Sequence, residues 1–401
     1  MKVTPRVIPL RTYACAAFLT LFSLLVAGCG SDLAVEAWKE QGSEAGSGAA
    51  KLEPPDGAVY TGVAVNRPGD WSIGGAIEEW ENWSELVGGR TAISHEFTTL
   101  DNWPQWAYDI AEARGATPML SLEAQGGYET EFTTTDVARG EQDEYILRHA
   151  HLAREHSSPI FLRLGHEMNG EWYSYSAYNE DGSPRANTTE DYKQMWRRVS
   201  IIFDGGSVRQ INSNLQKHGL APLNSEADVP EWMDYPRLDR PDARIPPADN
   251  VAFVWSPNAL SIPDVEGNQP LDYYPGDQFV DWVAQDVYHA PWSTSDWRFF
   301  RNMDKFYQEF SVERGKPYML AEFGLESHPR GWDSDDAHAD FVSRVLNWYE
   351  ERPKAKALVY YSWDIVDQGK TFKTLDNDPE SAETIAEAWR QQRYLGEVRE
   401  R

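Results

Sequence analysis

Short apolar runs alternate with amphipathic stretches from Val59 almost to the end of the chain. The runs are apolar nearly throughout, instead of alternating between apolar and polar residues, which is typical of strands covered on both faces of a parallel sheet. We predict eight strands, at Val59–Val65, Thr91–Phe97, Pro118–Leu122, Ile160–Leu164, Val251–Trp255, Trp282–Val287, Tyr318–Ala321 and Ala357–Tyr361.

Helical patterns lie between these strands. One begins at Asn102, with Pro104 near its first turn, and ends at Arg114-Gly115, which is the usual placement of proline and glycine at helix ends. Further helices are predicted at Asp136–His156, Glu190–Phe203, Asp296–Arg314, Asp335–Glu351 and Pro379–Arg390. Strands that alternate with helices predict an α/β fold with a parallel sheet, and a closed (β/α)8 TIM barrel explains eight strands better than a doubly wound sheet.

A polar, proline-rich stretch from Asp204 to Asn250 interrupts this alternation. So long a segment without an obvious element is either a loop lining the active face of the barrel or a disordered insert. We expect a partly ordered loop.

The first 57 residues have a different character. Lys2, Arg6 and Arg11 precede an apolar run that ends in Val26-Ala27-Gly28-Cys29, which is similar to a bacterial lipoprotein signal peptide with Cys29 as the lipidated residue. An uncleaved membrane anchor is the alternative, although the run is short for a span. Both place the rest of the chain outside the cytoplasm, on the extracellular side of the membrane. We therefore predict a signal peptide at 1–28, a Gly/Ser-rich flexible tether at 29–57 and a single folded domain at 58–401.

The amino-acid composition limits the classes of partner that the protein can bind. The 64 acidic residues outnumber the 37 Lys and Arg, giving a formal net charge of −27 that would repel a phosphate backbone and excludes nucleic acid as a partner. The 17 Trp and 19 Tyr suit either a tryptophan-rich core or a wet binding cleft for a neutral ligand.

Two carboxylates directly follow apolar strands. Glu167 comes after the fourth predicted strand and Glu322 after the seventh. In a barrel, the carboxyl ends of the strands carry the chemistry. Two carboxyl groups placed ~5–5.5 Å apart are what a retaining glycosidase requires, one as acid/base and one as nucleophile. Either residue alone would more readily be explained as a salt-bridge or capping residue.

The segments around these residues resemble glycoside hydrolase family 26, which belongs to the retaining glycosidase clan A. Arg163–Trp172 has the Arg-x-x-His-Glu-Met-Asn-Gly-x-Trp pattern of the acid/base segment, and Glu322-Phe323-Gly324 is similar to the nucleophile segment. Trp255-Ser256-Pro257-Asn258 and the sixth-strand segment from Gly276 to Tyr288 are also similar to the family.

The resemblance implies roles for individual residues. Glu167 is implied as the acid/base and Glu322 as the nucleophile, with the pKa of Glu167 raised by burial and by the charge of Glu322. His166 is implied to hydrogen-bond the nucleophile or the sugar, and Tyr288 to position the nucleophile. Further substrate-binding roles are implied for Asp286 and for the stacking platforms Trp172 and Trp363. Arg163 is expected to pair with a buried carboxylate, for structural or catalytic reasons.

The substrate is less sharply indicated. Endo-β-1,4-mannanases dominate the family, and β-1,3-1,4-glucanases and β-1,3-xylanases also occur in it. Mannanases of the family often have His after the third strand, where this chain has Glu123. Glu123 is therefore expected either to bind sugar or to pair with Arg163. We expect hydrolysis of a β-linked polysaccharide, with β-mannan first and mixed-linkage glucan or β-1,3-xylan as alternatives.

A catalytically silent carbohydrate-binding lipoprotein is the rival function, and the two intact carboxylates argue against it. We expect no cofactor and no metal, because no Cys or His at ligand spacing accompanies His166. The expected partners are a polysaccharide or oligosaccharide and, through Cys29, the membrane; the chain is expected to be a monomer.

Overall fold

The computed structural model describes residues 51–65, 72–127, 131–156, 158–233, 235, 237–289, 296–327, 335–363, 366–367, 370–373 and 375–398. The predicted signal peptide, most of the tether and the lipidation site Cys29 lie outside the described residues. None of the helices among the described residues is long and apolar enough to cross a membrane.

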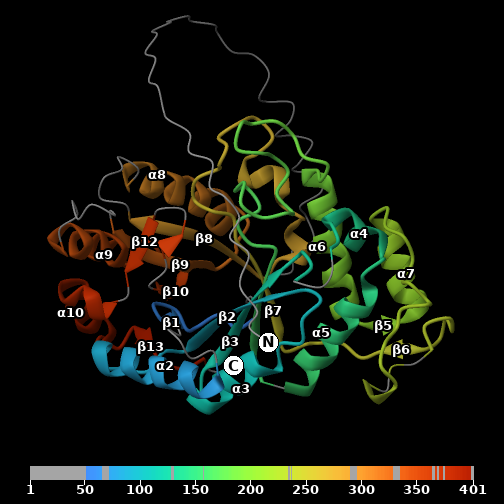
Figure 1. Ribbon diagram of the computed structural model, residues 1–401, viewed down its shortest axis with the longest axis horizontal. Coiled ribbons are helices and arrows are strands. Elements are labelled where there is room, and N and C mark those ends of the chain that lie inside the picture. The colour runs from blue at the N-terminus through green and yellow to red at the C-terminus, as the bar shows by residue number, and fades with distance from the viewer. Residues whose placement is uncertain are drawn as a thin grey trace, which may run out of the picture. The chain divides into compact units, whose positions relative to one another are not determined.

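Eight parallel strands form a closed barrel (Figure 1). In chain order they are β1 (Val59–Val65), β2 (Ile93–Thr99), β3 (Thr117–Glu123), β4 (Ile160–Leu164), β7 (Val251–Trp255), β8 (Trp282–His289), β9 (Tyr318–Ser327) and β10 (Ala355–Ser362). Each strand pairs in parallel with the next, and β10 pairs with β1 to close the barrel, with Tyr60 opposite Ala357. The predicted TIM barrel is confirmed.

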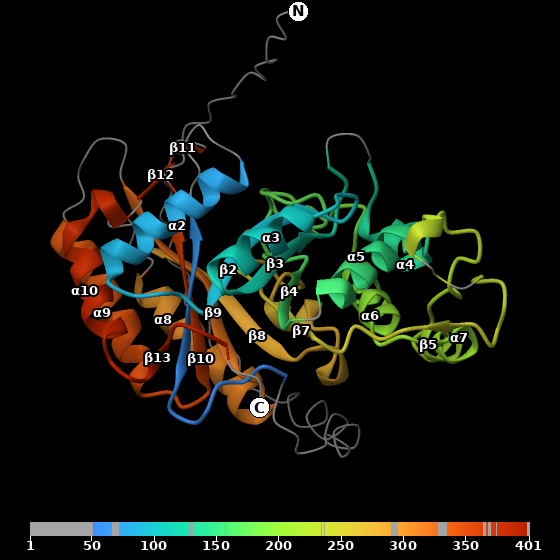
Figure 2. The same cartoon turned by 90° about the horizontal axis from the view of Figure 1, so that it is seen from below.

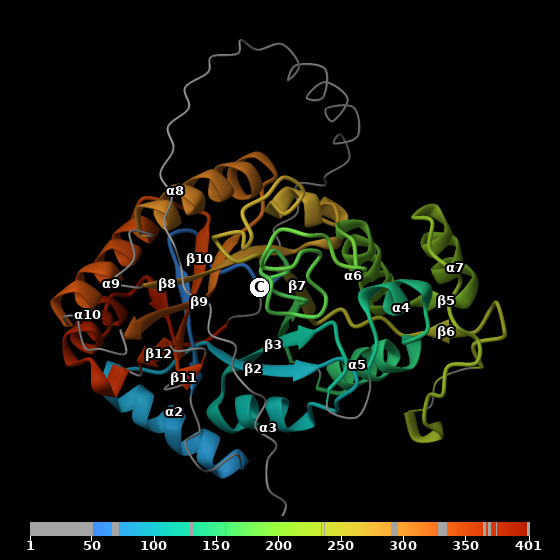
Figure 3. The same ribbon diagram turned by 45° about the horizontal axis from the view of Figure 1, so that its top comes forward.

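Helices cover the outside of the barrel (Figure 3). They are α2 (Ile73–Val87), α3 (Gln105–Arg114), α4 (Thr134–Arg139), α5 (Asp143–His156), α6 (Thr189–Phe203), α8 (Asp296–Phe306), α9 (Asp335–Glu350) and α10 (Pro379–Trp389). Short elements complete the chain: the 3-10 helices η1 (Glu231–Met233), η2 (Pro270–Tyr273), η3 (Asp277–Phe279) and η5 (Leu375–Asn377), and the strands β11 (Val366–Asp367), β12 (Lys370–Lys373) and β13 (Tyr394–Leu395).

Three helix predictions need correction. The sequence reading had no helix at α2, whose first turn is capped by the Ser72 side chain. The predicted helix 136–156 is two helices, because Gly140 adopts φ 87° and ends α4. A side chain at Gly140 would overlap the Arg198 guanidinium, so the break is also a packing requirement. The predicted helix 296–314 continues beyond α8 as a π-helix, η4 (Tyr307–Glu313).

The described residues of the Asp204–Asn250 segment (204–233, 235 and 237–250) include regular secondary structure and lie away from the active face. They contain β5 (Gly206–Ser207), α7 (Val208–Lys217) and β6 (Arg244–Ile245), which lie together beyond α5 and α6 (Figure 2). The segment leads from the end of α6 to the start of β7, so it belongs to the amino-terminal edge of the strands. The expectation that it lines the active face was wrong, because a segment that leads from a helix to the next strand lies at the end of the barrel opposite to the active face.

Two apolar layers position the strand ends. Side chains that point into the barrel, such as Phe161, Trp282 and Met319, form one buried cluster. Outward-pointing strand residues pack against the helices in a larger cluster that includes Leu162, Trp196 and Trp255. The inner cluster fills the barrel below the carboxyl ends of the strands, and polar side chains replace it only at that end.

Candidate active site

Glu167 lies in a tight turn that follows β4, and this turn directs its side chain over the end of the barrel. Gly165 and Glu167 adopt left-handed backbone conformations, with φ of 51° and 53°. This conformation is uncommon for a residue with a Cβ atom, and such strain is frequent at functional sites. The Glu167 N–H donates to the Ser256 carbonyl (2.7 Å), and the Gly170 N–H donates to the Glu167 carbonyl (2.8 Å), so the turn is held from both sides.

Glu322 reaches the barrel interior through an irregularity in β9. Gln285 of β8 lies opposite Leu320, but the next residue, Asp286, lies opposite Glu322, so one extra residue stands in β9 at Ala321. A bulge of this kind reverses the alternation of side chains from that point. Regular alternation from Met319 and Ala321, which point inward, would have turned Glu322 outward.

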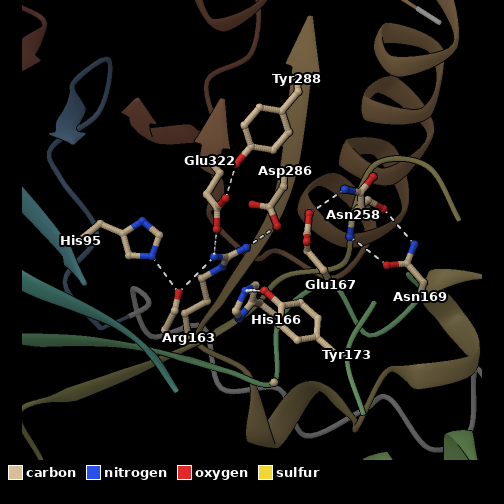
Figure 4. Close-up of polar contacts among 12 residues, drawn as sticks. His95, Arg163, His166, Glu167, Asn169, Tyr173, Asn258, Asp286, Tyr288 and Glu322 are labelled. Atoms are coloured by element: carbon tan, nitrogen blue, oxygen red, sulfur yellow. Dashed lines mark hydrogen bonds and ion pairs between the residues drawn. The ribbon is translucent and has the colours of Figure 1, made fainter. Parts of the chain in front are cut away.

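Arg163 of β4 holds Glu322 in place. Its fully buried guanidinium forms ion pairs with the carboxylates of both Glu322 and Asp286 (Figure 4). The same guanidinium donates to the Ser121 hydroxyl (3.0 Å), which also bonds His95 Nε2 (2.7 Å). The Tyr288 O–H donates to the other Glu322 oxygen, Oε2. Both oxygens of Glu322 therefore accept hydrogen bonds, one of them within an ion pair, and this arrangement suits a carboxyl group positioned as a nucleophile.

Glu167 has a different environment. Burial, and then the neighbouring charge of Glu322, raise the pKa of Glu167 to about 7, although Arg163 and two hydrogen bonds oppose this. These bonds come from the Asn258 amide to Oε1 (2.6 Å) and from the Trp172 indole N–H to Oε2 (2.8 Å). One carboxyl is thus paired with a cation while the other is suited to carry a proton near neutral pH, which is the division of roles between a nucleophile and an acid/base.

His166 does not bond the nucleophile. Its Nε2 lies 2.6 Å from the Tyr173 hydroxyl, and Tyr173 stacks on Tyr175 with ring centroids 4.8 Å apart. Burial and the nearby Arg163 lower the pKa of His166 well below its usual range, so the ring is neutral where Nε2 and the Tyr173 hydroxyl share a hydrogen bond. A bond between His166 and Glu322 was one of two expectations; the other, a contact with sugar, stays a prediction.

Aromatic side chains border the carboxylates. Trp172 is 37% exposed beside Glu167. Trp363 stacks on Tyr361 (5.6 Å between centroids, 10° between planes), and Phe97 meets it edge-on. Both tryptophans have aromatic faces near the two glutamates, and their role as stacking platforms for sugar stays a prediction.

Glu123 and Asp286 contact different protein partners. Glu123 accepts a hydrogen bond from Gln125 (2.7 Å) and does not pair with Arg163. It lines a cavity of about 660 Å³ together with Phe97, Asp101 and neighbouring residues, and burial raises its pKa. Asp286 is fully buried behind Glu322, where burial raises its pKa despite Arg163. Asp286 supports Arg163 through its ion pair, and its predicted contact with sugar stays a prediction.

Sequence reasoning missed four contributors to the site: His95, Ser121, Tyr173 and Asn258. Asn258 was noted only as part of a segment, with no role. Its bond to Glu167 joins the ends of β4 and β7, which pair in the barrel, but the two residues are 91 positions apart in the chain, so no local pattern indicates it. In the described part of the chain, no group of three or more His, Cys, Asp or Glu side chains is arranged to hold a metal ion.

Comparison with known proteins gives consistent matches. Residues 245–320 match the family model described as Glycosyl hydrolase family 26. Endoglucanase H of Acetivibrio thermocellus is 26% identical over 251 residues, which are 61% of this chain and 22% of that protein. The β-1,3-xylanase TXYA of a Vibrio species is 22% identical over 284 residues, covering 67% of this chain and 49% of that protein. The chain thus spans less than half the length of either relative.

The fold has solved counterparts. The catalytic domain of a GH26 endo-β-1,4-mannanase from Bacillus sp. JAMB-750 superimposes with a TM-score of 0.53, covering 86% of this chain and 89% of that one, at 16% sequence identity. At this identity the likeness establishes the barrel fold.

Proposed function

The match to the family model and the sequence similarity to Endoglucanase H place the chain in glycoside hydrolase family 26, and from this premise we propose that it is a retaining glycoside hydrolase acting on a β-linked polysaccharide. The contrast between the two glutamates carries the proposal. Arg163 and Tyr288 bind the two oxygens of Glu322, while burial raises the pKa of Glu167 to about 7.

The reaction follows from this contrast. Glu167 gives its proton to the glycosidic oxygen as Glu322 attacks the anomeric carbon, so the bond to the leaving sugar breaks and a glycosyl ester forms on Glu322. Loss of the Glu322 charge then lowers the pKa of Glu167, which accepts a proton from water as that water attacks the ester. The sugar is released with its original β configuration.

β-1,4-Mannan is the first proposed substrate, on the frequency of mannanases in the family and their presence among the solved counterparts. Mixed-linkage β-glucan is the second, supported by Glu123 in place of the histidine common in mannanases and by the similarity to an endoglucanase. β-1,3-Xylan is a further alternative.

Glycosidase activity is tested by reducing-sugar release from mannan, lichenan and β-1,3-xylan. Glu322→Ala is expected to lose at least about 10⁴-fold in kcat, because removal of a covalent nucleophile leaves only binding and proton transfer. Glu167→Ala is expected to lose about 10²–10⁴-fold on polysaccharide but much less on an aryl glycoside whose leaving group needs no proton.

Two results would overturn the proposal. Wild-type protein that binds oligosaccharide without releasing product from any of the three polymers would favour a binding lipoprotein. Early appearance of the α-anomer by NMR would contradict the two-glutamate assignment.

We further propose that Cys29 is lipidated and holds the domain at the outer side of the cell membrane, supported by the apolar run that ends in Val26-Ala27-Gly28-Cys29. Incorporation of labelled fatty acid into the full chain, and its loss in Cys29→Ala, is the expected result. Labelling that persists in Cys29→Ala would contradict the assignment.

A further inference from the structure

Asn258 is held so that its side-chain amide has one permitted orientation. Its Oδ1 accepts the Leu260 N–H (2.9 Å), and its Nδ2 donates to Glu167 Oε1 (2.6 Å). Rotating the amide by half a turn would place oxygen against oxygen at Glu167 and N–H against N–H at Leu260. The Asn258 amide can therefore only donate to Glu167.

A second asparagine fixes the backbone of Asn258. Asn169, which is fully buried, accepts the Asn258 N–H at Oδ1 (2.8 Å) and donates from Nδ2 to the Asn258 carbonyl (2.9 Å). Asn268 in turn donates to the Asn169 carbonyl (3.0 Å). Figure 4 shows the Asn169 amide bonded to Asn258 and the Asn258 amide bonded to the Glu167 carboxyl group. Asn258 is thus immobilised from the side away from the cleft.

Several charged or titratable groups from different elements also surround Glu167. They are Arg163 of β4, Asp286 and Tyr288 of β8, Glu322 of β9, and Tyr173 in the loop after β4. Burial and the carboxylates favour the protonated form of Glu167, whereas Arg163 favours the ionised form. Neutral donors to Glu167 are the Trp172 indole and the Asn258 amide.

We propose that Asn258 is a positioning residue that sets the acid strength of Glu167: its fixed N–H stabilises the carboxylate that forms when Glu167 gives its proton to the leaving sugar. This inference rests on the proposed glycosidase function and extends it to the second step. In that step, the carboxylate with its Asn258 bond accepts a proton from the attacking water. Both steps leave the Asn258 amide unchanged.

Two variants separate the amide donor from the turn that it supports. Asn258→Asp keeps an oxygen to accept the Leu260 N–H but loses the donor to Glu167. Asn258→Ala loses both. Asn250→Ala is the matched control, because Asn250 stands at the opposite end of β7 and its amide donates only to the backbone carbonyls of Ala153 and Ser158.

The expected result is a shift in the basic limb of the pH profile of kcat/KM, which reports the protonated acid in the free enzyme. The apparent pKa of this limb should rise by about one unit in Asn258→Ala and by more in Asn258→Asp, because the lost donor favoured the charged form of Glu167. Because a weaker acid gives up its proton less readily, the plateau of kcat/KM on polysaccharide should fall severalfold, with a smaller loss on an aryl glycoside with a good leaving group. Asn250→Ala should keep the wild-type limb.

A pKa measurement that needs no turnover keeps this inference separate from the glycosidase proposal. NMR titration of ¹³C-labelled Glu167 should show the same upward shift in both Asn258 variants, whether or not a substrate has been found. An unmoved Glu167 pKa in both variants, or equal losses on both substrates without a shift of the limb, would overturn the positioning role. An inactive wild type with shifted Glu167 titrations would instead contradict only the glycosidase proposal.

Discussion

Glu167 combines an uncommon backbone conformation with an uncommon side-chain environment. Its φ of 53° points the side chain toward Glu322, and its carboxyl oxygens both meet N–H donors in a buried site. The left-handed conformation costs about 1–2 kcal/mol for a residue with a Cβ atom. The strained backbone at Glu167 therefore lowers the stability of the fold while it directs this side chain into the site.

Because of this strain, replacing Glu167 by glycine should destabilise the protein less than replacing it by alanine, which is the reverse of the usual order within a helix. Glu167→Gly should be more stable than Glu167→Ala by about 1 kcal/mol, since glycine adopts positive φ without penalty. At exposed Glu78 in the middle of α2, the order should be reversed by a similar amount, because glycine is unfavourable within a helix. Urea unfolding of the four variants measures both differences. Equal stability of the two Glu167 variants would show that the turn after β4 is unstrained.

At the scale of elements, the bulge in β9 and the anchoring of the 204–250 segment stand out. The bulge moves Glu322 from the outer to the inner face of its strand. The segment is held by Arg198 of α6, whose fully buried guanidinium also forms an ion pair with Asp143 of α5. Arg198 also donates to the carbonyls of Ala221 (2.8 Å) and Pro222 (3.1 Å). The first feature serves the site, and the second serves stability alone.

Arg198→Met tests this separation. It should lower the free energy of unfolding by about 3–5 kcal/mol, because Asp143 would remain buried without its counterion. The double variant Asp143→Leu/Arg198→Met should recover much of that loss, since two apolar side chains need no pairing. KM and kcat per folded molecule should match wild type in both. A raised KM would mean that the segment contributes to the cleft after all.

At the scale of the whole molecule, an acidic chain of net charge −27 gathers three carboxyl groups, those of Glu167, Asp286 and Glu322, around one buried guanidinium. Arg163 can neutralise only one of them. The pKa of Glu167 is raised from 4.5 to about 7 on folding, mainly by burial. Folding therefore becomes less favourable as Glu167 ionises.

The sign of this linkage gives a pH-dependent prediction. A carboxyl with a raised folded-state pKa binds its proton more tightly in the folded protein, so the stability it confers is complete below about pH 4.5 and is lost as pH rises toward 7. Glu167→Gln removes this titration. Between pH 4.5 and pH 8, its stability relative to wild type should improve by about 2–3 kcal/mol, as measured by urea unfolding. A difference that is constant with pH would contradict the raised pKa.

Much of the fold and site followed from sequence because the information is local. Near-continuous apolar runs predict β4 and β7 to the residue, and the placement of Glu167 and Glu322 after such runs indicates paired carboxylates. The glycine at position 115 ends α3 as predicted, since only its own φ is involved. Predicted helix boundaries were wrong where side-chain packing sets the end of a helix, as at Gly140, which lies against the Arg198 guanidinium.

The barrel and the motifs that contain the two glutamates, Arg163, Tyr288 and Trp172 could be predicted from the sequence, because hydrophobic period and short motifs are properties of consecutive residues. The groups that these residues contact are visible only in the folded protein. The inward turn of Glu322 depends on a bulge, the partner of His166 is Tyr173, and Asn258 reaches Glu167 from another strand. Such contacts depend on the closure of the barrel, which brings together residues that no sequence period relates.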